Sequence, residues 1–148
     1  MALIRLIRWH RGEFMKESTF QFLGYRISKI ECVIKDNFNT TENKLAQSIQ
    51  VQLNYNEHNS RFVEVVLQID VKSADETFYF FITIKGGFQA EEEMPPELFD
   101  VMAKQNAPAI LFPFARAIIT SYTAQANIPP IILPTVNFAA PPQEKKES

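Results

Sequence analysis

Alternating apolar and polar residues in the middle of the chain restrict its fold more than any other feature. Residues 48–55, SIQVQLNY, and residues 62–72, FVEVVLQIDVK, both repeat with a period of two, as half-buried strands do. The NEHNS stretch between them supplies turn residues for a hairpin. The inward positions predicted for the two strands are Ile49, Val51, Leu53 and Tyr55, and Val63, Val65, Leu67, Ile69 and Val71.

Two further runs extend the predicted antiparallel sheet. TFYFFITIK, from Thr77, is apolar on both faces and has no obvious solvent side, and the character of the sequence changes after Gly86-Gly87. TFQFLGYRISKIECVIK, from Thr19, changes its inward face around Gly24 and again near Ser28. Such a change predicts a bulge associated with the glycine.

Two helices are predicted after the strands, which makes the fold class α+β. PPELFDVMAK, from Pro95, is typical of a short helix that begins at a proline and has Glu97 in its first turn. A long helix is predicted from Ala107 to about Ala126, with Pro113 bending its first turns. Its larger apolar residues recur at helical steps and predict the face on its own sheet: Leu111, Phe114, Ile118 and Tyr122.

A second, narrower stripe on the long helix consists mostly of small side chains: Ile110, Ala117, Ser121 and Ala124. Small residues let another helix approach closely, so we expect this stripe to pack against a neighbouring subunit. The chain then ends in NIPPIILPTVNFAAPPQEKKES. Its prolines favour extended structure, and its apolar residues are too many for a free linker, so we expect it to lie against the domain.

Length and charge exclude several classes of protein. With 148 residues, the chain has room for one domain. Fifteen basic and seventeen acidic residues give a net charge of −2, which argues against a nucleic-acid partner. The single cysteine, Cys32, and two histidines predict neither an internal disulfide nor a zinc site, and favour the reducing cytosol.

The first fourteen residues interrupt their apolar residues with three arginines, so they are not a secretory signal. We expect a disordered extension or a true start at Met15; a basic amphipathic helix that contacts a membrane or partner is the alternative. No later stretch is long enough to span a membrane, so no direct insertion is expected.

A search for catalytic chemistry returns little. Four glycines allow neither a phosphate loop nor a dinucleotide fingerprint, so no cofactor is predicted. We interpret His58 as a surface residue in a turn, Cys32 as a small buried hydrophobe rather than a reactive thiol, and residues 91–93, three glutamates, as an exposed loop or a docking site for a basic partner. Glu64, Asp70 and Asp75 could meet in space, but nothing favours it. The sequence therefore predicts no catalytic residues, no metal and no enzyme.

The chain has more apolar surface than one small sheet and two helices can cover. It contains thirteen phenylalanines, a strand apolar on both faces and an apolar tail. We expect the excess to serve subunit contacts and a groove that accepts other chains by non-directional burial.

The runs NAPAILFPFAR and IPPIILPTVNF resemble the signature of the SecB family of protein-export chaperones, and TFQF, FVEVVLQIDV and Gly86-Gly87 agree in order. The resemblance covers residues 18–139. It implies a four-stranded antiparallel sheet with helices, edge-to-edge dimers, and a tetramer, a dimer of dimers, built by packing long helices. It also implies a cytoplasmic, ATP-independent holdase that keeps unfolded preproteins competent for export and passes them to the ATPase SecA.

The resemblance further assigns roles to residues. The client groove is expected to be lined by residues of the crossover after the first strand and of the tail: Phe38, Leu45, Ile128, Ile131, Leu133, Val136 and Phe138. The tetramer interface is expected at Ala117, Ser121 and Ala124. The predicted organisation is an extension, 1–17, a SecB-like domain, 18–139, and a disordered polar tail, 140–148.

The sequence also departs from the family pattern. Positions where the family presents acidic residues to SecA hold Lys29, Val33 and Ile82 in an ungapped alignment, so SecA docking is not expected to follow the family's mode. Pro141-Pro142 and a total of ten residues after Phe138 predict that the family's second helix is absent. Protection of an antitoxin in a toxin–antitoxin system, binding of a lipid or small molecule, and a small enzyme of unknown reaction stay open as alternatives.

Overall fold

The computed structural model describes residues 6–8, 14–16 and 19–139. Its elements follow in the order β1 (Leu6–Arg8), β2 (Phe14–Lys16), β3 (Phe20–Ile34), β4 (Leu45–Tyr55), β5 (Phe62–Ser73), β6 (Phe78–Ala90), α1 (Pro96–Val101), the π-helical segment η1 (Met102–Asn106) and α2 (Ala107–Gln125). Within the predicted extension, β1 and β2 pair with each other. The predicted polar tail, residues 140–148, lies outside the described residues, and so do residues 1–5, 9–13 and 17–18 of the extension.

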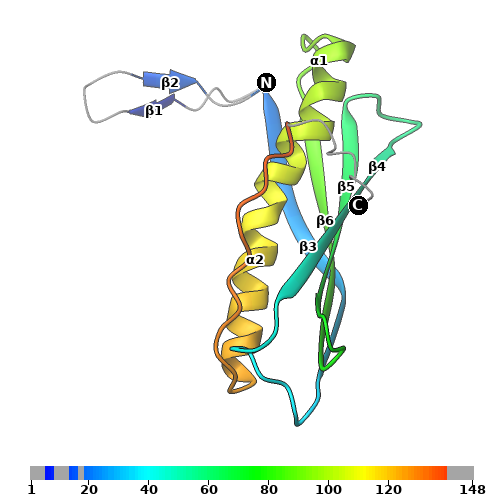
Figure 1. The fold of residues 1–148 in the computed structure, drawn as a ribbon. Coiled ribbons are helices and arrows are strands. Elements are labelled where there is room, and N and C mark those ends of the chain that lie inside the picture. The colour runs from blue at the N-terminus through cyan, green and yellow to red at the C-terminus, as the bar shows by residue number, and fades with distance from the viewer. Residues whose placement is uncertain (1–5, 9–13, 17–18, 140–148) are drawn as a thin grey trace.

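Strands β3 to β6 form the predicted four-stranded antiparallel sheet, in the order β3-β6-β5-β4. The inward positions predicted on β5 are confirmed: all five of its valine, leucine and isoleucine positions named above are 0% exposed. β4 pairs only with β5, so it is an edge of the described sheet, and its inward side is half-buried or exposed. The helices lie over one face of the sheet (Figure 1), with α2 against β6 and β5.

The two predicted irregularities in β3 are confirmed. The pairing with β6 shifts between Phe22 and Gly24, and again between Ile27 and Lys29. Gly24 has a φ of 120°, which an L side chain rarely adopts. Between the two shifts the odd positions Tyr25 and Ile27 pair with the inward positions Gly86 and Ile84, and beyond the second shift the inward face returns to even positions such as Ile30.

The last strand extends beyond the TFYFFITIK run and includes Gly86-Gly87. β6 continues to Ala90 and pairs through both glycines. Leu111 of α2 packs directly over Gly86, where an added Cβ would lie 2.6 Å from the Leu111 Cδ2 atom. The glycine therefore marks a close approach of helix to strand rather than a turn.

The two predicted helices form one continuous helical stretch joined by η1. The Ala107 N–H donates to the Met102 carbonyl, five residues back, so the turn before Pro108 is wider than an α-helical turn. A proline ring clashes with the carbonyl four residues earlier in a regular helix, and the wide turn relieves this contact. Pro113 also lies inside α2, on the exposed side of the helix. It cannot donate to the carbonyl of Ala109, and Ala109 is exposed as well.

The tail packs against the domain, as expected. After α2 the chain turns at Asn127 (φ 60°) and runs back along the helix in extended conformation (Figure 1). Ile131 and Leu133 are buried in the main core. The Phe138 and Phe112 rings meet edge-on, with their centres 5.7 Å apart.

Candidate binding surface

The stripe of small residues on α2 is exposed in the protomer. Ala117, Ser121 and Ala124 all face outward. A hollow of about 310 Å³ lies on one side of the stripe, lined in part by Tyr25, and a second of about 540 Å³ lies on the other. A ridge of small side chains between two shallow hollows has the shape that accepts a second helix at short distance.

Large apolar side chains surround this ridge. Phe114 and Tyr122 border the first hollow and are 37% and 43% exposed. Arg116 and Ile132 border the second, and Ile132 is 73% exposed. The ridge and both hollows thus form a continuous surface of mostly apolar character that the protomer leaves uncovered.

The predicted sheet-facing side of the long helix is partly wrong. Leu111 is buried as expected, but Phe114 and Tyr122 are exposed. The residues that are buried on α2 are instead Ala107, Pro108, Leu111, Phe112, Ala115, Ile119 and Thr123. Small Ala115 lets the helix approach the sheet closely, whereas the aromatic rings lie at its flank, where Phe114 contacts Tyr25 and Tyr122 contacts Phe80.

The seven residues predicted to line a client groove lie in two environments. Phe38, Leu45, Ile128, Val136 and Phe138 are half-buried and pack against the core. Ile131 and Leu133 are 6% and 3% exposed and belong to the core itself. Their role toward a client stays a prediction.

The outer face of the sheet holds the positions compared with the SecA-docking residues of the family. Lys29 and Val33 face outward, and Lys29 lies 3.2 Å from Glu31 and 5.5 Å from the centre of the Phe81 ring. Ile82 is fully buried on the inner face. The ungapped assignment of a docking position to Ile82 is therefore wrong, because that side chain cannot reach a partner.

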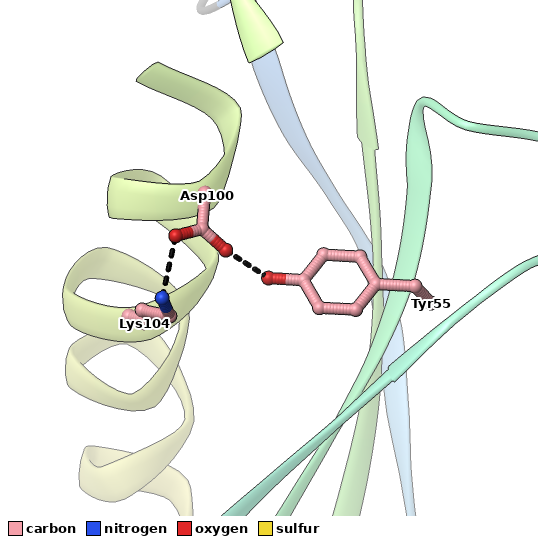
Figure 2. A network of polar contacts seen from close by, with 3 residues as sticks. All are labelled: Tyr55, Asp100 and Lys104. Atoms are coloured by element: carbon pink, nitrogen blue, oxygen red, sulfur yellow. Dashed lines mark hydrogen bonds and ion pairs between the residues drawn. The ribbon is translucent and has the colours of Figure 1, made fainter. Parts of the chain in front are cut away.

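A polar network ties the end of β4 to the helices (Figure 2). The Tyr55 hydroxyl donates to Asp100 Oδ1 at 2.5 Å, and Lys104 Nζ lies 2.5 Å from Asp100 Oδ2. The hydrogen bond and positive charge of Lys104, with the bond from Tyr55, lower the pKa of Asp100. Partial burial, then the bond to Asp100 and its negative charge, raise the pKa of Tyr55 to about 12. Sequence periodicity gives no sign of this contact, since its partners lie 45 residues apart.

Tyr55→Phe is expected to lower the free energy of unfolding by about 0.5–1.5 kcal/mol at neutral pH, because it removes one solvent-exposed hydrogen bond. The folded pKa is raised above the unfolded value, so this contribution is present below about pH 10 and is lost as the pH rises through about 12. Urea titrations of both proteins at pH 7 and 11 measure the effect. Tyr79→Phe is the matched control, since the Tyr79 hydroxyl makes no hydrogen bond within the described residues. Equal losses for the two variants would contradict the role of Tyr55.

The carboxylates singled out in the sequence do not converge. Glu64 and Asp70 lie on the outer face of β5 opposite Gly87 and Phe81, and Asp75 lies in the following turn. There the Thr77 and Ser73 hydroxyls donate to Asp75 and lower its pKa to about 2, which explains it as a turn residue. Burial raises the pKa of the Cys32 thiol, which disfavours the reactive thiolate. Among the residues that the structure describes, no cluster of metal-binding side chains occurs.

Two residues that sequence patterns did not single out stand next to the tail. Thr120 and Thr123 of α2 hold the main chain of Ile131 through their hydroxyls. Thr123 is buried in the helix face on the sheet, at a position where the helical period predicts an apolar residue. A buried threonine at an apolar position is the signal that could have identified it.

Comparison with known proteins places this architecture. The family described as preprotein translocase subunit SecB matches residues 29–148. An uncharacterized protein of Methanocaldococcus jannaschii is 31% identical over 124 residues, covering 80% of this chain and 79% of that protein. The protein-export protein SecB of Anaplasma phagocytophilum is 42% identical over 84 residues, and that of Methylobacillus flagellatus is 33% identical over 86. These two alignments span about half of the relatives' own length, 52% and 55%.

The fold has a solved counterpart in the SecB-like chaperone of Mycobacterium tuberculosis in complex with an antitoxin peptide. The TM-score is 0.64 at 11% identity, covering 80% of this chain and 88% of that one. No helix within the described ranges is long and apolar enough to cross a membrane. SecB family chaperones are not enzymes, in agreement with the sequence-based prediction. Because the family match spans residues 29–148, most of this chain, the chain belongs to the SecB family.

Proposed function

We propose that the protein is an ATP-independent cytoplasmic chaperone that holds unfolded preproteins in apolar grooves and keeps them competent for export. Membership of the SecB family carries the proposal. The uncovered apolar side chains on one protomer support it, among them Leu23 and Ile132, which are 58% and 73% exposed. Burial of apolar surface is non-directional, so such a surface can bind many sequences.

The client groove of the proposal runs along the tail (Figure 1), from the crossover after β3 to Phe138, which packs against Phe112 near the start of α2. Its accessible walls are the five half-buried residues Phe38, Leu45, Ile128, Val136 and Phe138. Each client side chain that becomes fully buried contributes about 1.5–3 kcal/mol, and the ordering of the client offsets much of it. One groove is therefore weak, and several grooves on one assembly bind tightly together.

The assembly of the proposal is a dimer of dimers. The exposed ridge of α2 supports helix packing between dimers. In the described sheet β3 is an edge strand of 15 residues with Leu23 and Val33 exposed, which supports edge-to-edge pairing within a dimer. Because Lys29 and Val33 replace acidic residues on the outer face, SecA is not proposed to dock there in the family's mode.

The second candidate function is protection of an antitoxin. The solved M. tuberculosis chaperone shares the fold and holds an antitoxin peptide, which supports this alternative within the same holdase chemistry. Pull-down of the tagged protein from native cells separates the two: recovery of exported precursors supports the export role, whereas recovery of one antitoxin supports the alternative.

Purified protein, without ATP, is expected to suppress aggregation of a slowly refolding polypeptide at about one tetramer per chain. Light scattering during refolding from denaturant measures it, with an equal mass of serum albumin as the control. A chaperone effect that appears only in large excess, or not at all, would contradict the proposal. A stoichiometric small ligand in native mass spectrometry together with no suppression would favour a lipid or small-molecule carrier.

A further inference from the structure

The tail segment Pro129–Pro134 is held on α2 through the main chain of a single residue. Thr120 Oγ1 donates to the Ile131 carbonyl at 2.7 Å, and the Ile131 N–H donates to Thr123 Oγ1 at 2.9 Å. Thr123 donates its own proton back to the Ile119 carbonyl of the helix at 2.8 Å. Both backbone groups of Ile131 are therefore satisfied by two side chains of α2.

The side chains of the segment alternate like those of a strand. Ile131 and Leu133 are 6% and 3% exposed in the core, whereas Ile132 between them is 73% exposed. An extended chain turns successive side chains to opposite sides, so positions i and i+2 enter the protein together. The place that this segment fills accepts an extended polypeptide with apolar residues at alternate positions.

The attachment of the segment is local. Pro129, Pro130 and Pro134 have no N–H to donate, and within the described residues the hydrogen bonds of the segment are the two at Ile131. Two buried side chains and two hydrogen bonds hold it, whereas β5 and β6 are joined by a full ladder. Segments with so few contacts open at lower free energy than the sheet core.

We infer that this strip of α2 is a client subsite, and that the chain's own Pro129–Pro134 segment occupies it in the free protein. A client enters by displacing the segment and placing alternating apolar residues where Ile131 and Leu133 lie. Thr120 and Thr123 contact only main-chain groups, which every residue except proline carries in full, so the subsite selects an alternating apolar pattern rather than a particular side chain. The inference rests on the proposed chaperone function and names the site and the class of segment that it binds.

The segment is tethered to the subsite, so a client competes with a high local concentration of segment. Weakening the segment alone therefore strengthens client binding. A permanent groove wall behaves in the opposite way, because loss of a wall side chain removes contacts to the client. The sign of the change distinguishes the two roles.

The first test compares Leu133→Ala with Ile132→Ala, two adjacent substitutions of similar size at a buried and an exposed position. The probe is fluorescently labelled, reduced and carboxymethylated lactalbumin, which cannot refold. We expect the Kd to fall about tenfold for Leu133→Ala and to stay within about twofold for Ile132→Ala. Weaker or unchanged binding by Leu133→Ala would overturn the inference.

The second test uses the wild-type chain and so does not depend on a variant folding. Hydrogen exchange of the Ile131 amide, protected by Thr123, is followed by NMR with and without the same probe. We expect exchange at Ile131 to accelerate on client binding while amides of β5 stay protected. Client binding with retained protection at Ile131 would overturn this inference alone, whereas no binding by wild type or either variant would overturn the chaperone function as well.

Discussion

Phe80→Ala is expected to lower the free energy of unfolding by about 3–5 kcal/mol, which approaches the whole stability of a small domain. Phe80 is 0% exposed near the start of β6, and its ring centre lies 5.4 Å from that of Tyr122 on α2. Removal of the ring leaves a cavity between the sheet and α2. The sheet cannot collapse into this cavity, because β6 is hydrogen-bonded to β3 on one side and to β5 on the other. Urea unfolding followed by circular dichroism measures the loss.

Phe81→Ala provides the control, because it removes the same ring from the next residue of the same strand. Phe81 faces the outer side of the sheet and is only half-buried. We expect its cost to be less than half that of Phe80→Ala, since less apolar area is lost from burial and no enclosed cavity forms. A larger cost for Phe81→Ala would mean that its outer face is covered in the native assembly.

The double variant Ser121→Arg/Ala124→Arg is expected to convert the proposed tetramer into dimers. Two long charged side chains on the ridge prevent the close approach that small residues allow, and they would bury unpaired charge at the contact. Static light scattering at fixed protein concentration gives the mass. With fewer grooves on one particle, binding of a long unfolded client should weaken by at least about tenfold.

Gln50→Arg/Gln52→Arg adds the same charge to the exposed polar face of β4 and is the matched control. Its mass and client affinity should equal those of the wild type. A tetramer that persists in Ser121→Arg/Ala124→Arg would place the interface elsewhere than on α2.

The sheet could be predicted from the sequence because its signal is local. A period of two fixes which residues of β5 point inward, and the change of phase around Gly24 and Ser28 locates both bulges. The need for a glycine at position 86 could not be predicted in this way. Its reason is the side chain of Leu111, which comes from a helix 25 residues further on and requires the absence of a Cβ there.

The candidate surface was predicted less completely. The small side chains of Ala117, Ser121 and Ala124 indicated an outward ridge, and the protomer leaves them exposed. The tail was expected to lie against the domain, but an apolar sequence does not specify which surface buries it. Ile131 and Leu133 enter the core, whereas Ile132 does not, because the turn at Asn127 and the two threonines of α2 set the register.

The wide turn at η1 determines the rotational phase of everything that follows it. The residues that face the sheet continue through it: Phe99 before the turn, Ala103 within it, and Ala107 and Leu111 after it. Each residue of a helix advances the direction of its side chain by about 100°. Loss of a single residue from this turn would rotate α2 about its axis and move the Ala117 ridge from its outward position. The proposed contact between protomers would then be reoriented, although none of its residues had changed.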